Sequence, residues 1–428
     1  MFSLATGVWI LLVGYFAWRY PHWVLQLVAI VLPSYLLRLK IFGIPTTWLE
    51  LTVYTVFIIW IWRGYLRAQW WRPLSLYWQP ILLIGVGLIV GTVVSTDLFL
   101  SLGIIKGWFI DPLLLFILIN NSVNRNHPET VFNYMILGLW FSGTILAVIA
   151  LYQVISGNFI TVDQRASAWF SSANYLSLYL VPIIVLVIGW WRNINTIYQK
   201  ATRTIYFQKI IGGGLLLMIS ALYFTFSYAG WLALFLGVLV FWLLTNPIGK
   251  MGWLWLVGIG LIIISQLQTP KFQQMLDFVG RSSSHVRLQV WQTALLMIKE
   301  HWVTGIGLGL FEKRYLEFAT KIFYPPIELL MLHTHNIIFQ FWVNTGLIGV
   351  TGFIWLVGVF LSRLWRVVVL KHSLATIIFS AMVALLIHGL FDGAYWKNDL
   401  SMLFWIIIAL GSILINQTNG RQKLSNRN

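Results

Sequence analysis

The chain has 428 residues, of which 59% are hydrophobic and 9% are charged, with no cysteine and a formal net charge of +16. About a quarter of the residues in a soluble domain are charged, so this composition excludes an ordinary soluble protein, and the absence of cysteine excludes disulfide and thiolate chemistry. The excess lysine and arginine lies in short connections between apolar runs, which is the positive-inside pattern of membrane proteins. We therefore do not expect nucleic acid as a partner.

Apolar runs of membrane-spanning length recur along the whole chain, which predicts an all-α, polytopic integral membrane protein. The segment 24–40 is interrupted by Pro33, Arg38 and Lys40. If it is re-entrant or interfacial, about 12 transmembrane helices remain and both termini are cytoplasmic; if it crosses, the N-terminus lies outside. The expected spans are 4–18, 24–40, 47–62, 79–95, 101–119, 131–155, 174–191, 210–226, 229–245, 252–267, 337–361, 373–391 and 400–416.

The basic connections predict which side of the membrane each loop occupies. We expect a single membrane domain over residues 1–428, in which residues 268–336 form a large external, periplasmic-side loop region that carries the active site. The loops expected in the cytoplasm are 63–78, 192–209, 246–251, 363–372 and the C-terminal tail. The loops expected outside are 96–100, 156–173, 268–336 and 392–399.

The stretch 268–336 is polar, whereas most of the chain is apolar. It is too polar to span a membrane and too long for a turn, and an amphipathic pattern predicts a helix near residues 286–301. We expect one or two helices that lie on the membrane surface as a lid. Placing arginine and histidine among membrane helices costs free energy, so a polar stretch that carries them is the first candidate for a functional site.

His335 and Asn336 stand at the beginning of the next apolar run. Nine residues separate Asn336 from Gly346, and two more separate Gly346 from Gly349. The two glycines share one face at helical spacing, so they would let a neighbouring helix approach. Histidine suits proton abstraction at neutral pH, which makes His335 a candidate general base; the alternative is an interfacial histidine that only caps the helix.

Three arginines on the same expected side are candidates for anion binding. Arg281 and Arg287 precede His335, and guanidinium is the preferred bidentate clamp for phosphate. The alternative for these two is interfacial snorkelling or contact with phospholipid. Arg165, with Asn174, lies in a loop that leads into the next span, where a plain loop arginine is an equal alternative.

A metal site is not expected. His333 and His335 face the same way only if the backbone between them is extended, and Glu328 is the nearest preceding carboxylate. The sequence contains no HExxH motif and no cysteine, and it lacks the carboxylate cluster that would hold a cation-bound pyrophosphate.

The spaced motif of His335, Asn336, Gly346 and Gly349 resembles that of the O-antigen ligase and Wzy-type polymerase superfamily of bacterial envelope glycosyltransferases. Ligases of that superfamily carry a His-Asn/Ser/Gln pair, then nine residues and a spaced glycine pair, and this chain fits the pattern fully. The resemblance is specific over residues 281–349 and is architectural elsewhere, through the number of spans and the large external loop.

The neighbourhood of the motif is similar as well. Arg287 is followed by Trp291, then by TGIGLGLF at residues 304–311, and the segment His-Gly-Leu-Phe-Asp at residues 388–392 precedes the last span. The sequence departs from the family at Tyr228, where many members have an arginine. One phosphate contact is therefore missing, or another arginine supplies it: Arg165 or Arg281.

The resemblance implies a GT-C-like fold in the bacterial plasma (inner) membrane and glycosyl transfer on its outer face. The implied donor is a glycan on a polyprenyl pyrophosphate such as undecaprenyl pyrophosphate. The implied acceptor is a hydroxyl of lipid A-core sugar, of another lipid-linked repeat, or of a protein or wall polymer.

His335 would accept the hydroxyl proton, and Arg287 and Arg281 would hold the leaving pyrophosphate. No cofactor, nucleotide or metal is needed, because the energy is in the pyrophosphate linkage. The further substrate-binding candidates are Arg165, His333 and Asn336.

Two alternatives remain beside the ligase. A Wzy-type polysaccharide polymerase needs the same clamp and joins repeats instead of transferring finished chains. A small-anion transporter, of the bicarbonate type that shares this superfamily's domain, should place ionisable residues at the bilayer midplane and show paired halves with broken helices. The spans contain few charges apart from Glu50, Lys106 and Asp111 and the chain has no internal repeat, so the sequence favours a transferase.

Overall fold

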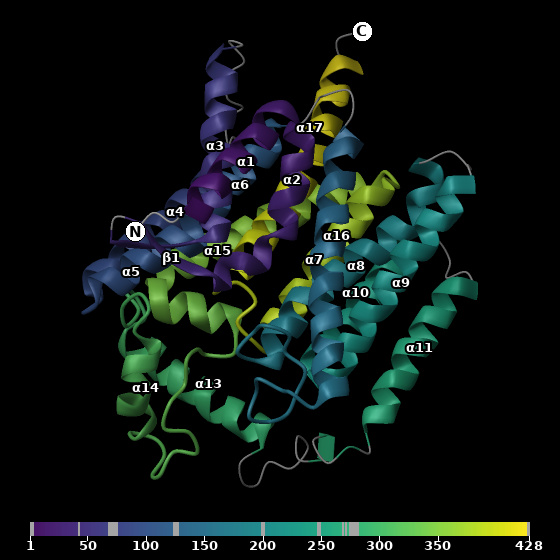
Figure 1. The fold of residues 1–428 in the computed structure, drawn as a ribbon. Helices are drawn as coiled ribbons and strands as arrows, with labels where there is room; N and C mark the ends of the chain where they lie inside the picture. Colours follow the sequence, from purple (N-terminus) through teal and green to yellow (C-terminus); the bar gives the residue numbers. More distant parts are fainter. Residues whose placement is uncertain are drawn as a thin grey trace.

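The structure is a computed structural model that describes residues 4–41, 43–66, 76–122, 128–197, 202–245, 250–267, 269, 272–273 and 282–425. Its described part is built from helices apart from one two-stranded hairpin (Figure 1). Seven of the described helices are long and apolar enough to cross a membrane, and five shorter apolar helices accompany them. The prediction of an all-α, polytopic membrane protein is therefore confirmed, whereas the number of about 12 spans stays a prediction.

The segment 24–40, which Pro33, Arg38 and Lys40 were expected to interrupt, is not one helix. Helix α2 ends at Ile30, and the chain continues as a 3₁₀ helix, η1, and an antiparallel hairpin in which Arg38 pairs with Thr47. Pro33 lies in the first turn of η1, and its missing N–H and the clash of its ring with the carbonyl four residues earlier disfavour a continuation of α2. The elements here are α1 (Leu4–Arg19), α2 (Pro21–Ile30), η1 (Leu32–Leu36), β1 (Arg38–Ile41), β2 (Ile44–Thr47) and α3 (Trp48–Leu66).

The middle of the chain follows the predicted spans within a few residues at most boundaries. The expected span 101–119 is interrupted by a π-helical turn, η2, so that it consists of α5, η2 and α6 in succession. The elements are α4 (Trp78–Val94), α5 (Leu98–Ile104), η2 (Ile105–Ile110), α6 (Asp111–Asn121), α7 (Pro128–Ser156), α8 (Ala173–Ile197), α9 (Thr202–Phe224), α10 (Tyr228–Thr245) and α11 (Lys250–Gln266).

The polar stretch contains the predicted amphipathic helix, α13, and a second, shorter helix, α14. Buried apolar side chains from both helices form a small core of their own, separate from the main core of the bundle. Figure 1 shows α13, α14 and the loop between α7 and α8 at one end of the bundle, with the C-terminal end of α17 at the opposite end. The remaining elements are α13 (Ser283–Glu300), α14 (Phe311–Ala319), α15 (Ile337–Val369), α16 (Ser373–Gly389) and α17 (Asn398–Ser425).

The glycine pair of the motif has two different roles in packing. Gly349 lets α4 approach α15, because a Cβ on the facing Gly87 would lie 2.5 Å from the Gly349 Cα atom. The expected close approach of a neighbouring helix is therefore confirmed for Gly349. Gly346 instead has a φ of +64°, which breaks the regular geometry of α15, and a Cβ there would collide with the carbonyl oxygen of Val303.

The glycine-rich segment 305–309 is held between α4 and α15 by its backbone. Ile306 donates its amide to the Val343 carbonyl (2.9 Å) and Leu308 donates to the Gly91 carbonyl (2.8 Å). Glycines 305, 307 and 309 all have positive φ, a conformation that suits residues without a Cβ. This segment therefore anchors α13 and α14 to the membrane bundle.

Candidate functional site

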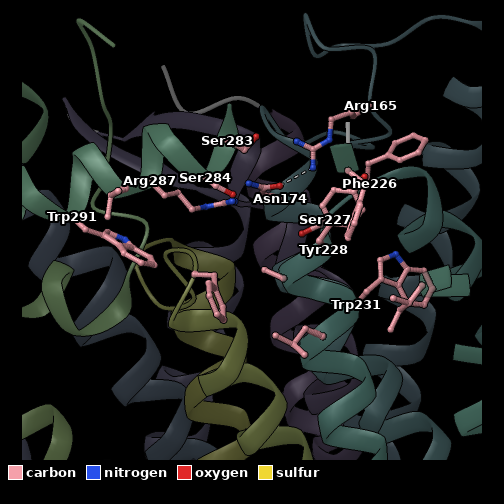
Figure 2. A pocket seen from close by; sticks show the side chains of 16 residues that line it. Arg165, Asn174, Phe226, Ser227, Tyr228, Trp231, Ser283, Ser284, Arg287 and Trp291 are labelled. Atoms are coloured by element: carbon pink, nitrogen blue, oxygen red, sulfur yellow. Dashed lines mark hydrogen bonds between the residues drawn. The ribbon is translucent and has the colours of Figure 1, made fainter. Parts of the chain in front are cut away.

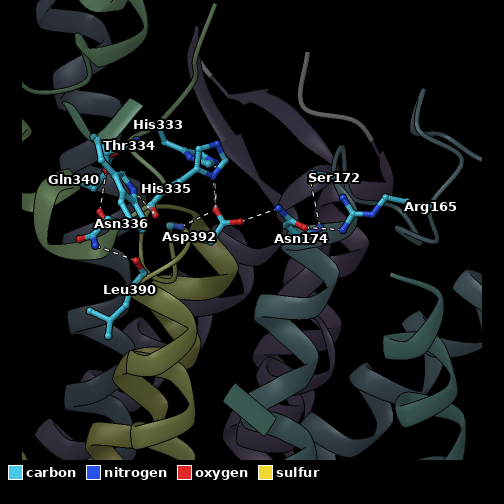
Figure 3. Close-up of polar contacts among 12 residues, drawn as sticks. Arg165, Ser172, Asn174, His333, Thr334, His335, Asn336, Gln340, Leu390 and Asp392 are labelled. Atoms are coloured by element: carbon cyan, nitrogen blue, oxygen red, sulfur yellow. Dashed lines mark hydrogen bonds and ion pairs between the residues drawn. The ribbon is translucent and has the colours of Figure 1, made fainter. Parts of the chain in front are cut away.

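A chain of polar contacts joins His335, Asp392, Asn174 and Arg165 (Figure 3). His335 Nδ1 lies 3.2 Å from Asp392 Oδ1, and Asn174 Nδ2 donates to Asp392 Oδ2 at 3.0 Å. Arg165 Nη2 in turn donates to Asn174 Oδ1 at 2.8 Å. The four residues come from the start of α15, the α16–α17 connection, the first turn of α8 and the α7–α8 loop, so tertiary folding assembles the chain of contacts.

Asp392 is the centre of this arrangement and is only 2% exposed. Burial alone would raise the pKa of its carboxyl group, but the adjoining histidines, His335 first, and the Arg287 charge hold that pKa well below its ordinary value. The backbone amide of Gly393 also donates to Oδ1, at 2.8 Å. Asp392 is therefore an ionised, hydrogen-bonded carboxylate at neutral pH.

The sequence analysis assigned no role to Asp392. The only trace of it in the sequence was its position in the segment 388–392 before the last span. The side chains that contact it lie more than fifty residues away along the chain, since 57 positions separate Asp392 from His335 and 218 separate it from Asn174. No local pattern predicts such a contact.

His333 packs against His335 and also faces Asp392. The two imidazole rings lie edge to face with centroids 4.1 Å apart, and His333 Nε2 is 3.7 Å from Asp392 Oδ1. Burial first, and then the neighbouring His335 and Lys397, lower the pKa of His333 to about 3. His333 is therefore neutral at pH 7.

The backbone around His335 fixes the direction of its ring. His335 has a φ of +50°, and its carbonyl oxygen accepts a hydrogen bond from Trp291 Nε1 at 3.3 Å. The N-cap of α15 is Asn336, whose Oδ1 accepts from the amides of Ile338 and Phe339. The alternative that His335 itself caps the helix is therefore wrong.

Asn336 was expected to bind substrate, and its polar atoms are already engaged. While Oδ1 caps α15, Nδ2 donates to the Leu390 carbonyl at 3.0 Å. This second bond ties the start of α15 to the α16–α17 connection that carries Asp392. Asn336 thus has a structural role in holding His335 and Asp392 together, which is sufficient to explain its place in the motif.

A pocket of about 520 Å³ lies beside these residues (Figure 2). Figure 2 shows Arg287, Asn174 and Arg165 in a row across its polar end, with Trp231 farther along α10. Leu232 and Ile263, from α10 and α11, add apolar surface to the wall. The pocket therefore combines a cationic end with an apolar end along membrane helices, as a binding site for an amphipathic anion requires.

Arg287 and Arg165 line the polar end in different ways. Within the described part of the chain, Arg287 has no hydrogen-bond or ion-pair partner, and its Nε atom is buried. Arg165 is held in place, because it donates to the Thr225 carbonyl at 2.6 Å and pairs with Asp163 at 3.2 Å. An unpaired, partly buried guanidinium is stabilised when an anion binds, so Arg287 is the better candidate for direct contact.

Arg281 and Tyr228 are the two remaining positions at which an arginine was considered. Arg281 lies outside the described residues, so its expected role is not tested. Tyr228, which stands where many family members have an arginine, lines the same pocket as Arg165, and its hydroxyl lies 3.0 Å from Thr269 Oγ1. Arg165 is therefore placed where it can supply the cation that Tyr228 lacks.

The fold and the site define a polytopic helical membrane protein whose ionisable site, with an adjoining cationic and apolar pocket, is built at one end of the bundle. Residues 213–354 match the family model described as O-antigen ligase. The resemblance is thus confirmed over this part of the chain; members of that family are glycosyltransferase-like enzymes that use lipid-linked glycans. The comparison with curated proteins gives no match. The matched segment contains Arg287 and His335, whereas Arg165, Asn174 and Asp392 lie outside it.

Replacing Asn336 separates the capping role from substrate contact. Asn336→Ala should lower the free energy of unfolding by about 1 kcal/mol, the usual effect of losing an N-cap, whereas Asn336→Ser should keep the cap and stay close to wild type. Thermal unfolding of the purified protein in detergent measures both. Asn336→Ser also loses the Nδ2 bond to the Leu390 carbonyl, so the decisive result is retained activity: an Asn336→Ser protein that transfers glycan like wild type would show that the amide does not contact substrate.

Proposed function

We propose that the protein is an O-antigen ligase-like glycosyltransferase. It moves a glycan from a polyprenyl pyrophosphate, such as undecaprenyl pyrophosphate, to an acceptor hydroxyl on the outer face of the bacterial plasma membrane. The observation that carries this proposal is the His335–Asp392 pair next to a pocket lined by Arg287 and Arg165. The match of residues 213–354 to the O-antigen ligase family supports the same reaction class.

In the proposed mechanism, Asp392 sets the tautomer of His335. An ionised carboxylate 3.2 Å from Nδ1 accepts a hydrogen bond from Nδ1–H, which favours the tautomer with a lone pair on Nε2. Nε2 then takes the proton of the acceptor hydroxyl as its oxygen attacks the anomeric carbon. Asp392 also stabilises the imidazolium that forms, because its negative charge lies against the ring.

The leaving group is the second part of the mechanism. As the acceptor oxygen bonds to the anomeric carbon, the bond from that carbon to the pyrophosphate oxygen breaks and negative charge develops on the pyrophosphate. Arg287 would bind this charge with its planar fork, with Arg165 adding positive potential. The apolar end of the pocket, along α10 and α11, suits the first prenyl units of the donor lipid. No metal or nucleotide takes part in this reaction.

A polymerase and a transporter are the two alternative functions. A Wzy-type polymerase would use the same base and clamp, with a lipid-linked repeat as acceptor, so it remains the closest alternative. The transporter alternative depended on the charges within spans: Lys106 and Glu50 pair with each other, and Asp111 accepts a hydrogen bond from a tyrosine. Lys106 Nζ lies 2.7 Å from Glu50 Oε2, and the Tyr54 hydroxyl donates to Asp111 at 2.5 Å, away from the pocket-lining residues.

The proposed orientation can be tested with single cysteines, since the chain has none. Val162, in the α7–α8 loop, is fully exposed and should face outward, whereas Ser373, at the start of α16, is exposed and should face the cytoplasm. In intact cells, an impermeant maleimide should label Val162→Cys and not Ser373→Cys. Both should react after lysis. Labelling of Ser373→Cys alone in intact cells would place the site on the cytoplasmic face and remove the proposed reaction.

Two substitutions test the catalytic pair. His335→Asn and Asp392→Asn should each lower glycan transfer by about 10²–10⁴-fold, the usual contribution of a general base, because the first removes the base and the second favours the wrong tautomer. Transfer is measured in membranes supplied with lipid-linked donor. The matched control is His301→Ala, at the end of α13 and outside the pocket, which should keep wild-type activity. An active His335→Asn protein would reduce the histidine to a structural role.

The proposed clamp is tested at Arg287. Arg287→Ala should lower transfer by about 10- to 100-fold, since a charge-assisted hydrogen bond contributes about 1.5–3 kcal/mol. Arg287→Lys should lose much of the activity as well, because a point charge does not replace the planar fork. Arg314→Lys is the control, since Arg314 pairs with Glu317 on α14 and does not line the pocket. Wild-type glycan output from Arg287→Ala at equal protein level would exclude this residue from the mechanism.

A further inference from the structure

His333, His335 and Asp392 form a set of three donors with the spacing of a metal site. His335 Nδ1 and His333 Nε2 lie 3.2 Å and 3.7 Å from the same oxygen, Asp392 Oδ1, and all three donor atoms are within 4.8 Å of one another. In a tetrahedral zinc site with bonds of about 2.0–2.2 Å, neighbouring ligand atoms are about 3.3 Å apart. The distances from Asp392 Oδ1 to the two histidine nitrogens, 3.2 and 3.7 Å, are already close to that value.

The turn that carries the histidines explains why they converge although only one residue separates them. The positive φ of His335 replaces the extended backbone that this spacing would otherwise require. Thr334 between them is buried, its amide donates to Gln340 Oε1 at 2.7 Å, and its hydroxyl donates to the Asn336 carbonyl at 2.9 Å. The two rings are thus held on one side of a fixed turn, facing the carboxylate.

We propose that His333, His335 and Asp392 are an inhibitory binding site for Zn²⁺ and similar divalent transition metals. Two imidazoles and one carboxylate make a donor set that such ions prefer, and three protein ligands leave a fourth position for water. Mg²⁺ and Ca²⁺ favour sites made of oxygen ligands, so they bind this set poorly. Metal binding is independent of the proposed function, whereas the inhibitory effect rests on it.

Inhibition follows from the chemistry of the imidazole ring. A neutral imidazole carries one proton, and when Nδ1 binds a metal that proton is on Nε2. Nε2 then has no lone pair for the proton of an acceptor hydroxyl. The metal also takes the Asp392 oxygen that otherwise accepts from His335. The ion therefore removes both features that make His335 a base, without any change in the fold.

Metal binding is measured first, on the purified full-length protein in detergent, without a polyhistidine tag and stripped of metal. Equilibrium dialysis against Zn²⁺ should find one tightly bound ion in the wild type and in His301→Ala, a control outside the triad. In His333→Ala the affinity of that ion should fall by at least roughly 100-fold, the upper range for loss of an outer-shell partner alone. Equal Zn²⁺ affinity in His333→Ala and wild type would overturn the proposal.

X-ray absorption of the zinc-loaded wild type covers the possibility that His333→Ala fails to fold. It should show two imidazole ligands and one carboxylate oxygen at about 2.0–2.2 Å. Fewer than two imidazoles would overturn the proposal.

Glycan transfer then tests the effect of the ion. Zn²⁺ should inhibit the wild type, EDTA should restore activity, and Mg²⁺ at the same concentration should have no effect. The activity that remains in His333→Ala should resist Zn²⁺, while His301→Ala should be as sensitive as wild type. Equal sensitivity of His333→Ala and wild type would overturn inhibition at this site. A protein that binds Zn²⁺ through the triad but transfers no glycan under any condition would contradict the proposed function and leave the metal site established.

Discussion

The buried carboxylate of Asp392 is the group on which the rest of the site depends. A charge taken out of water is strongly destabilising unless it is paired and hydrogen-bonded, and Asp392 is nearly inaccessible to solvent. Its partners are His335 at the start of α15, Asn174 in the first turn of α8 and the amide of Gly393 in its own loop. One carboxylate thus determines where the ends of helices far apart in the sequence must meet, and any group that competes for its oxygens acts on all of them.

Backbone contacts place α13 and α14 relative to this centre. Residues 305–309 lie between α4 and α15, and the broken geometry at Gly346 accommodates the chain at Val303. Because α13 directly precedes this anchored segment, the helix that carries Arg287 is fixed near the helix that begins after His335. Trp291 reinforces this through its bond to the His335 carbonyl. The position of Arg287 relative to His335 is therefore set by contacts with the bundle.

The sequence was sufficient for the features that depend on local composition. Apolar runs predicted nearly all of the long helices, amphipathic spacing predicted α13, and the motif at His335 led to the family that residues 213–354 match. The hairpin at 38–47 was missed, because charged and proline-containing residues can end a helix in many ways. Asp392 and the packing of Asn174 against it were missed because they depend on contacts over 57 and 218 residues. The capping bonds of Asn336 were not predicted, since a cap is recognised only when the backbone of α15 is seen to begin there.

Lys397, next to the site, lies against three aromatic rings from distant parts of the chain. Its Nζ atom is 3.4 Å from the ring centre of Tyr175 and 5.2 and 5.4 Å from those of Phe170 and Tyr35, and Tyr175 packs on His333. Tyr35 belongs to the irregular N-terminal segment, far outside the residues that identify the family. The matched segment is thus smaller than the set of residues that surrounds the two histidines. A chimera that took only residues 213–354 from another chain would place the histidines in one parent and Asp392, Asn174 and Tyr35 in the other, so the contacts around the histidines would depend on both.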